Sequence, residues 1–272
     1  MKQNKGERRM AKGSKWIKHL ARTGYFARGL VYSIIGLFAI LAAIGSAESK
    51  DTRDALQTVL SQPFGSALVT VLIVGLVSYG LWRLFQAVMD PDDHGFGARG
   101  LAVRAGLLTS AVTYGLLAFY ALSLVGISNG GEGDGASPAE MIAGFFGSRP
   151  VSIALAAIFA GVAIAHWWKA YRRKYAEHLK ASDAVMTWLH PISMTGLAAR
   201  GCVFSILAML LIFRGLMSED GSGTPGIKDA LEYTQDLPFG AFLLAALGVG
   251  VVLFAVYSFA EAIWREINIE DA

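Results

Sequence analysis

Six apolar segments, each long enough to cross a lipid bilayer, constrain the fold of this 272-residue chain more than any other feature. A helix needs about 20 residues to span a hydrocarbon core, and a backbone in lipid must satisfy its own hydrogen bonds, so helices are expected. Charged residues make up only 17% of the chain, against about 25% in soluble proteins. The predicted membrane spans are residues 24–45, 66–89, 103–127, 151–170, 195–217 and 239–264.

The first apolar segment opens with a motif that the chain repeats twice in approximate form. The shared form is Gly-x-x-x-(Arg or Ser)-(Gly or Ala)-x-x-(Tyr or Phe)-x-x-x-(Gly or Ala), and the copies begin at Gly24, Gly106 and Gly196. The stretch Asp-Ala-Leu followed by Pro-Phe-Gly also occurs twice, at residues 54–65 and 229–240. Self-similarity at a period of about 80 residues predicts a fold that is built by repetition.

These observations predict a single all-α membrane domain, a polytopic bundle of six transmembrane helices in three tandem two-helix repeats. Two spans return the chain to the side from which it started, so the units run parallel and pseudo-threefold symmetry about the membrane normal is expected. The expected boundaries are a basic cytoplasmic tail at residues 1–18 and repeats at residues 19–90, 99–175 and 190–266.

The first segment could instead belong to a secretory signal peptide. A basic tail, an apolar run from Leu30 to Ile44, and the small residues Gly45 and Ala47 fit its three regions. The recurrence of the segment at residues 103–127 and 195–217 favours a membrane span, because no signal peptide could lie there.

Lysine and arginine are distributed unequally between the two sides of the membrane. With the N-terminus inside, 19 of the 24 lie on the cytoplasmic side, which predicts that both termini are cytoplasmic and that the protein lies in a bacterial inner membrane. In the outer loops, Ser137-Pro138 and Thr224-Pro225 are typical of helix starts. We therefore expect three short helices on the periplasmic surface.

The arginines of the motif are the strongest candidates for a binding role. Arg28 and Arg200 each precede an aromatic residue, Tyr32 or Phe204, by four positions and so share a helix face with it. They could be structural, either by reaching toward the lipid headgroups or by pairing with Glu261, or they could face the bundle and hold an anion. The candidate ligand- or headgroup-binding residues are Arg28, Tyr32, Ser110, Tyr114, Arg200 and Glu261.

Aromatic residues gather near the cytoplasmic ends of the second and fourth predicted spans. Tyr79 and Trp82, and likewise Trp167 and Trp168, are typical of an aromatic belt at the membrane interface. His166 lies beside the second pair and is a candidate proton relay, because imidazole changes its charge near neutral pH.

Other features indicate packing or solvated turns rather than chemistry. Residues 90–94 (Asp-Pro-Asp-Asp-His) could hold a divalent ion but lack the ligand spacing of a calcium loop, so a solvated turn is favoured. The single cysteine, Cys202, lies in an apolar segment and is expected to be a core residue. Small residues spaced four apart, including Ala157, Gly161 and Ala165, predict close helix packing. With no nucleophile–base motif present, we expect no enzymatic activity, no cofactor and no metal.

Three stretches resemble a known family of bacterial membrane proteins, the domain of unknown function 1206. They are residues 21–32 (Ala-Arg-x-Gly-Tyr-x-Ala-Arg-Gly-x-x-Tyr), residues 79–82 (Tyr-Gly-x-Trp) and the loop at residues 90–97 (Asp-Pro-Asp-Asp…Gly). The resemblance covers roughly residues 19–266 as three units, and the second unit departs most, at Ser110. It implies a six-helix inner-membrane protein and no particular reaction.

Two functions remain open from the sequence. The first is a non-enzymatic interaction, scaffold or lipid-binding protein, which would contact anionic headgroups on the cytoplasmic side and other membrane proteins, but no nucleic acid. The second is a transporter or channel for a small solute such as an anion, in which Arg28, Ser110 and Arg200 would meet at one depth around a central axis. The two functions differ in whether the arginines face a shared cavity or the headgroups.

Overall fold

The computed structural model describes residues 3–45, 57, 60–61, 63, 65–92, 94–125, 148–217 and 233–267. Apart from one isolated antiparallel bridge, these residues contain helices and turns but no β-strand. Six of the described helices are long and apolar enough to cross a membrane, so the chain is a multi-pass helical membrane protein. The elements are α1 (Gln3–Ala43), α3 (Gly65–Met89), α4 (Ala98–Leu124), α6 (Ser148–Tyr171), η1 (Ala176–His178), α7 (Asp183–Met217) and α9 (Gly240–Trp264).

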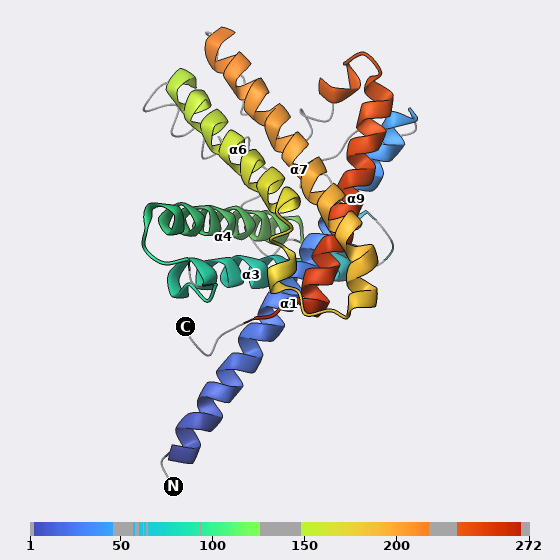
Figure 1. The fold of residues 1–272 in the computed structure, drawn as a ribbon. Helices are drawn as coiled ribbons and strands as arrows, with labels where there is room; N and C mark the ends of the chain where they lie inside the picture. The colour runs from blue at the N-terminus through green and yellow to red at the C-terminus, as the bar shows by residue number, and fades with distance from the viewer. Residues whose placement is uncertain are drawn as a thin grey trace.

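Helix α1 is longer than the first predicted span. It begins at Gln3, so most of the basic segment at residues 1–18, which we interpreted as a tail without an apolar period, continues the helix. In Figure 1 the N-terminal part of α1 extends away from the other helices. The apolar part of α1 that could cross a membrane is Lys18–Ala43. The short helices expected in the outer loops fall almost entirely outside the described residues.

The long helices pack against one another in a fixed order. The pairs in extensive contact are α4 with α3, α3 with α1, α1 with α9, α9 with α7, and α7 with α6. Within the described residues, α4 and α6 are not such a pair, so the row is open at its two ends. Figure 1 shows the α3–α4 and α6–α7 pairs extending in different directions from the centre of the molecule.

Helices α1 and α9 make the most extensive contact of the row and cross at two glycines. A Cβ atom placed on Gly36 would lie 2.8 Å from the carbonyl oxygen of Gly248, and one placed on Gly248 would lie 2.8 Å from Ile40. Real side chains do not approach so closely, so the crossing requires glycine on both helices. Gly36 is the last residue of the first motif copy, and this close crossing explains why a glycine stands there.

Two further helix pairs, α1 with α3 and α7 with α9, each pack a glycine of one helix against an alanine of the other. Between α1 and α3, a Cβ atom on Gly75 would meet the Cβ of Ala27 at 2.2 Å. Between α7 and α9, a Cβ atom on Gly250 would meet the Cβ of Ala199 at the same distance. The glycines that open the motif also agree, since Gly24 lies against the backbone of Tyr79 and Gly196 against that of Phe254.

The middle pair of helices departs from this pattern. A Cβ atom on Gly106 of α4 or on Gly161 of α6 would meet nothing within 4 Å among the described residues. These two helices are also the least buried of the six. The prediction that Ala157, Gly161 and Ala165 mediate close packing is therefore wrong, because their face of α6 is exposed.

One end of the bundle is closed by short polypeptide connections. We call it the connector end, where residues 90–97 join α3 to α4, residues 172–182 join α6 to α7, and residues 265–267 follow α9. Leu179 and Arg265 form the isolated antiparallel bridge. The amide of Glu266 donates to the carbonyl of His178 at 2.8 Å. The chain after α9 is thereby fixed against the α6–α7 connection.

Candidate functional site

A polar cavity of about 200 Å³ lies between the helices, and side chains from all six of them line it. It contains four of the six residues predicted to bind a ligand or headgroup, and also His166. The two other predicted residues are placed beside it: Tyr32 contacts Arg200, and Glu261 pairs with Arg28. The lining residues are Arg28, Tyr79, Arg83, Ser110, Tyr114, Ala165, His166, Lys169, Leu197, Arg200, Phe254 and Tyr257.

Arg28 is fixed by hydrogen bonds to two neighbouring helices. Its side chain is 4% exposed, its Nε donates to the hydroxyl of Ser258 at 3.0 Å, and a terminal nitrogen donates to the hydroxyl of Tyr79 at 2.6 Å. The other terminal nitrogen pairs with Glu261. Arg28 therefore faces the bundle interior, and the interpretation that it reaches out to the lipid headgroups is wrong.

Glu261 lies between two arginines in the interior. It is 2% exposed and accepts hydrogen bonds from Arg28 and, at 2.8 Å, from Arg265 one turn later on the chain. Arg265 also lies 3.4 Å from the carboxylate of Asp92 in the α3–α4 connection. A buried carboxylate is stable when its lone pairs are satisfied by charged donors. Glu261 thus connects α1, α9 and the connector end.

Arg83 and Tyr79 extend this network along α3. Arg83 donates to the hydroxyl of Tyr79 and, at 3.0 Å, to the side-chain oxygen of Gln86, whose amide nitrogen donates to Asp92 at 2.8 Å. The Tyr79 hydroxyl therefore accepts hydrogen bonds from both Arg28 and Arg83. The arrangement holds two guanidinium groups side by side on one wall of the cavity.

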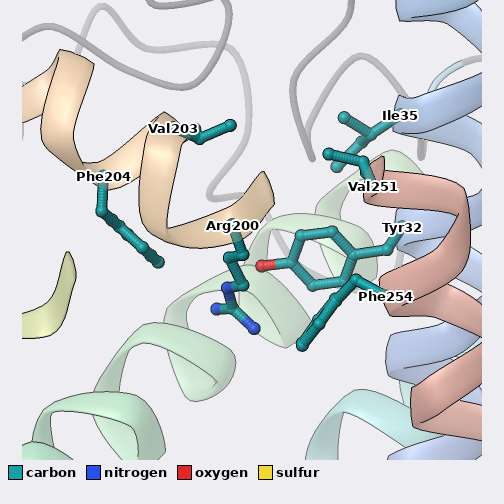
Figure 2. A pocket seen from close by; sticks show the side chains of 7 residues that line it. All are labelled: Tyr32, Ile35, Arg200, Val203, Phe204, Val251 and Phe254. Atoms are coloured by element: carbon teal, nitrogen blue, oxygen red, sulfur yellow. The ribbon is translucent and has the colours of Figure 1, made fainter. Parts of the chain in front are cut away.

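Arg200 is bound differently from Arg28. Among the described residues no carboxylate lies within ion-pair distance of it, and its buried Nε makes no hydrogen bond. Its guanidinium carbon lies 4.8 Å from the ring centre of Tyr32, 5.3 Å from that of Phe204 and 4.5 Å from that of Phe254. Figure 2 shows Arg200 between Phe204 on one side and Tyr32 and Phe254 on the other. Aromatic faces stabilise a cation but do not neutralise it.

A second, much smaller pocket adjoins the other side of Arg200. Its volume is about 20 Å³, and Ile35, Val203 and Val251 line it together with Arg200 and its aromatic neighbours. In Figure 2 these aliphatic side chains lie on the side from which the guanidinium points away. Arg200 therefore stands at the boundary between the polar cavity and an apolar interior.

Helix α6 supplies a lysine and a histidine to the cavity. Lys169 donates to the hydroxyl of Tyr257 at 2.9 Å. Nδ1 of His166 lies 2.8 Å from the carbonyl oxygen of Val162 on the same helix. The imidazole ring centre is 5.4 Å from that of Phe204, which also contacts Arg200. His166 is thus close to the arginine that lacks a carboxylate partner.

Helix α4 contributes hydroxyl groups instead of a cation. Ser110, at the position where the other two motif copies have arginine, donates to the carbonyl of Gly106 at 3.0 Å. The ring of Tyr114 packs edge-on against that of Tyr79 with 4.5 Å between centres. These hydroxyls line the cavity together with the arginines and can both donate and accept hydrogen bonds.

The charge of the cavity lining is positive. Four basic side chains line it (Arg28, Arg83, Lys169 and Arg200), and no aspartate or glutamate is among the lining residues. Glu261 lies behind Arg28 and is already shared with Arg265. A negatively charged or strongly hydrogen-bond-accepting group is the ligand that such a lining would stabilise.

The sequence patterns did not identify three polar residues of the lining, and they misplaced two aromatic residues of α3. Arg83, Lys169 and Tyr257 line the cavity, and Arg83 and Lys169 each follow a glycine, Gly75 or Gly161, by eight residues. Tyr79 and Trp82 are 2% and 1% exposed, so their assignment to an interfacial belt is wrong. Trp167 and Trp168, in contrast, are 44% and 48% exposed.

At the connector end, Asp90 forms a turn. It accepts hydrogen bonds from the backbone amides of His94 at 3.0 Å and Gly95 at 2.7 Å. Burial raises the pKa of Asp90, but these amide bonds outweigh it, so its pKa lies below the usual value. Burial lowers the pKa of His178 in the neighbouring connection, and Arg265 lowers it further. The described residues contain no group of three or more potential metal ligands.

Comparison with known proteins identifies the family of this chain. The sequence model of the family Domain of Unknown Function (DUF1206) matches residues 23–90 and 195–265, which carry α3, α9 and parts of α1 and α7. The chain is similar to "Uncharacterized protein YxxB" of Bacillus subtilis (strain 168), with 32% identity over 259 residues that cover 94% of each protein. No solved structure shows a significant match. The chain belongs to the DUF1206 family.

Proposed function

We propose that this membrane protein binds a small anion in the polar cavity and moves it across the membrane without enzymatic chemistry. The observation that carries the proposal is the placement of Arg200. It lines a cavity that it shares with three other basic side chains, and no carboxylate among the described residues pairs with it.

The cost of an unpaired arginine gives the physical reason. A basic side chain inside a membrane span costs at least about 2.5–3.5 kcal/mol, so such residues usually have a partner. Arg28 has Glu261, whereas the contacts of Arg200 within the described part of the chain are the faces of aromatic rings. An anion in the cavity would be the missing partner of Arg200, and the hydroxyls of Ser110 and Tyr114 could complete its coordination.

The order of helix contacts supports a pseudo-threefold arrangement of the three hairpins around the cavity. Each returning helix packs against the first helix of the next unit: α3 against α4, α6 against α7, and α9 against α1. We propose that the three hairpins surround the cavity in this cyclic order and that the ring is open between α4 and α6. The positive-inside bias supports an inner-membrane protein whose termini and connector end are cytoplasmic, so the cavity would open toward the cytoplasm.

A second candidate is the binding of an anionic lipid headgroup, and the open side between α4 and α6 favours it. Both helices contribute lining residues to the cavity, yet they are not in extensive contact within the described structure. Their outer faces carry exposed apolar side chains such as Val112 (56%) and Ile158 (53%). Acyl chains could lie along these faces while a phosphate enters the cavity.

Reconstituted vesicles would test the proposal and separate the two sources of anion. Uptake of labelled sulfate and of inorganic phosphate would be measured in vesicles of phosphatidylcholine alone. Copurification of phosphatidylglycerol would be measured in a mixed-lipid preparation. We expect Arg200→Gln to reduce anion uptake about ten- to a hundredfold, the range of one lost charged hydrogen bond. The exposed Arg172, which lies outside the cavity, provides the matched control Arg172→Gln.

The results distinguish the alternatives. Uptake that depends on Arg200 supports transport. Copurified phosphatidylglycerol that is lost in Arg200→Gln, without any anion uptake by the wild type, supports the lipid-binding role. If neither uptake nor lipid retention differs between Arg200→Gln and Arg172→Gln, anion binding in the cavity is excluded.

A further inference from the structure

We infer that anion binding in the cavity is linked to the uptake of one proton by His166. The inference rests on the proposed function and specifies how the site is regulated. It follows from the tautomer that the geometry imposes on His166 and from the charges that surround it.

The hydrogen bond of Nδ1 determines which nitrogen can titrate. A backbone carbonyl can only accept, so Nδ1 of His166 must carry the hydrogen that it shares with Val162. In the neutral ring, Nε2 is then the unprotonated nitrogen. Nε2 makes no hydrogen bond to the described residues, and it is not among the fully enclosed polar atoms that lack a partner. His166 lines the cavity, so Nε2 is the nitrogen to which we assign proton uptake there.

The groups around His166 oppose its protonation while the cavity is empty. Four of them are cationic, whereas the carboxylate of Glu261, behind Arg28, is already paired with two arginines. The titratable and charged groups that face the cavity from the six helices are Arg28 of α1, Tyr79 and Arg83 of α3, Tyr114 of α4, Lys169 of α6, Arg200 of α7, and Tyr257 of α9 with Glu261 behind Arg28.

An anion reverses this balance. It partly neutralises the cations, and it offers an acceptor for a hydrogen bond from protonated Nε2, so the charged imidazole becomes favourable. By linkage, protonation of His166 must then strengthen anion binding by the same factor. One proton from the aqueous phase would enter with each anion, and a monovalent anion would add no net charge to a site inside the membrane.

Lys169 is the other nitrogen base that α6 places in the cavity. It already donates a hydrogen bond to the hydroxyl of Tyr257 and so has a partner for its charged form. His166 has no such partner at Nε2, which is the reason to assign the proton to it. Substitution of the histidine alone therefore separates the two residues.

Sulfate is a suitable probe because it does not itself titrate near neutral pH. Binding would be measured by titration calorimetry on the full-length protein in detergent, between about pH 5.5 and 8, in buffers that differ in ionisation enthalpy. We expect wild-type affinity to fall with rising pH, by up to about tenfold per pH unit while His166 loses its proton, with uptake of about one proton per sulfate. His166→Gln should bind sulfate with no pH dependence and no proton uptake. The exposed His19, which does not line the cavity, provides the control His19→Gln and should behave like the wild type.

Three results would overturn the inference. Sulfate binding by the wild type without proton uptake excludes the linkage while leaving anion binding intact, and this measurement does not depend on any variant folding. If His166→Gln still takes up one proton per sulfate, another group accepts the proton, and Lys169 would be the next residue to test. If the wild type binds sulfate at neither end of the pH range, the proposed small-anion site and the inference are both excluded.

Discussion

Arg28 of α1 and Glu261 of α9 form a buried ion pair in which neither side chain is more than 4% exposed. The two residues differ in the number of oppositely charged side chains that they contact. Glu261 also accepts a hydrogen bond from Arg265, whereas Glu261 is the only carboxylate that Arg28 contacts among the described residues. The pair joins the two helices that pack most extensively, so it should contribute to the stability of the whole bundle.

We predict that Glu261→Gln destabilises the protein more than Arg28→Gln. Removing the carboxylate leaves the buried Arg28 without a counter-charge, which typically costs about 3–5 kcal/mol. Removing Arg28 leaves Glu261 paired with Arg265. Thermal unfolding in detergent would give the order of the two Tm values. Equal or reversed losses would show that Arg265 does not compensate for the loss of Arg28.

Trp82 tests whether the aromatic residues near the end of α3 are buried in the core or lie at the membrane interface. It is 1% exposed, its indole nitrogen donates to the hydroxyl of Tyr25 at 3.1 Å, and its ring stacks on Phe85. We predict that Trp82→Ala lowers the free energy of unfolding by about 3–5 kcal/mol, as expected for a large buried aromatic residue. Trp168→Ala, at a position 48% exposed, should lower it by much less. A similar loss in Tm for both variants would contradict the buried placement of Trp82.

The six spans could be predicted from the sequence because they depend only on length and hydropathy. The predicted and observed limits differ by a few residues at most ends, and the largest differences are at the starts of α1 and α7. Helix α7 continues through Pro191 back to Asp183, where the apolar pattern is weaker. Hydropathy locates the part of a helix that lies in lipid, not the part that extends beyond it.

Side-chain direction could not be predicted in the same way. Tyr79 and Trp82 lie near a span end, a position that aromatic belts and buried cores share, and only the packing of α3 against α1 distinguishes the two. The three residues that the repeated motif aligns, Arg28, Ser110 and Arg200, all line the one cavity. The pairing of Arg28 with Glu261, one of the interpretations that the sequence offers, is confirmed. The motif could not indicate that Arg200 has no carboxylate partner among the described residues, because the two copies carry the same arginine.

The connector end should lose stability in mild acid through His178. Burial and then Arg265 lower the pKa of this histidine in the folded protein. A histidine with a lowered folded pKa stabilises the protein above its unfolded pKa of about 6.5, and this contribution is lost as pH falls through the folded value. We predict that, below about pH 6.5, the Tm of the wild type falls more steeply with decreasing pH than the Tm of His178→Gln. The same comparison with His19→Gln should show no such change.

Glycine substitutions would test whether α4 and α6 remain apart in the membrane. At Gly75 a new Cβ would meet Ala27 at 2.2 Å, and at Gly250 it would meet Ala199 at the same distance, whereas at Gly161 it would meet nothing among the described residues. We predict that Gly75→Leu and Gly250→Leu each destabilise the protein by at least about 1–3 kcal/mol, the usual cost of overpacking. Gly161→Leu should leave the Tm nearly unchanged, because its side chain would enter open space. If Gly161→Leu is as damaging as the other two, α4 and α6 pack together in the membrane, the ring is closed, and a lipid headgroup could not enter the cavity from that side.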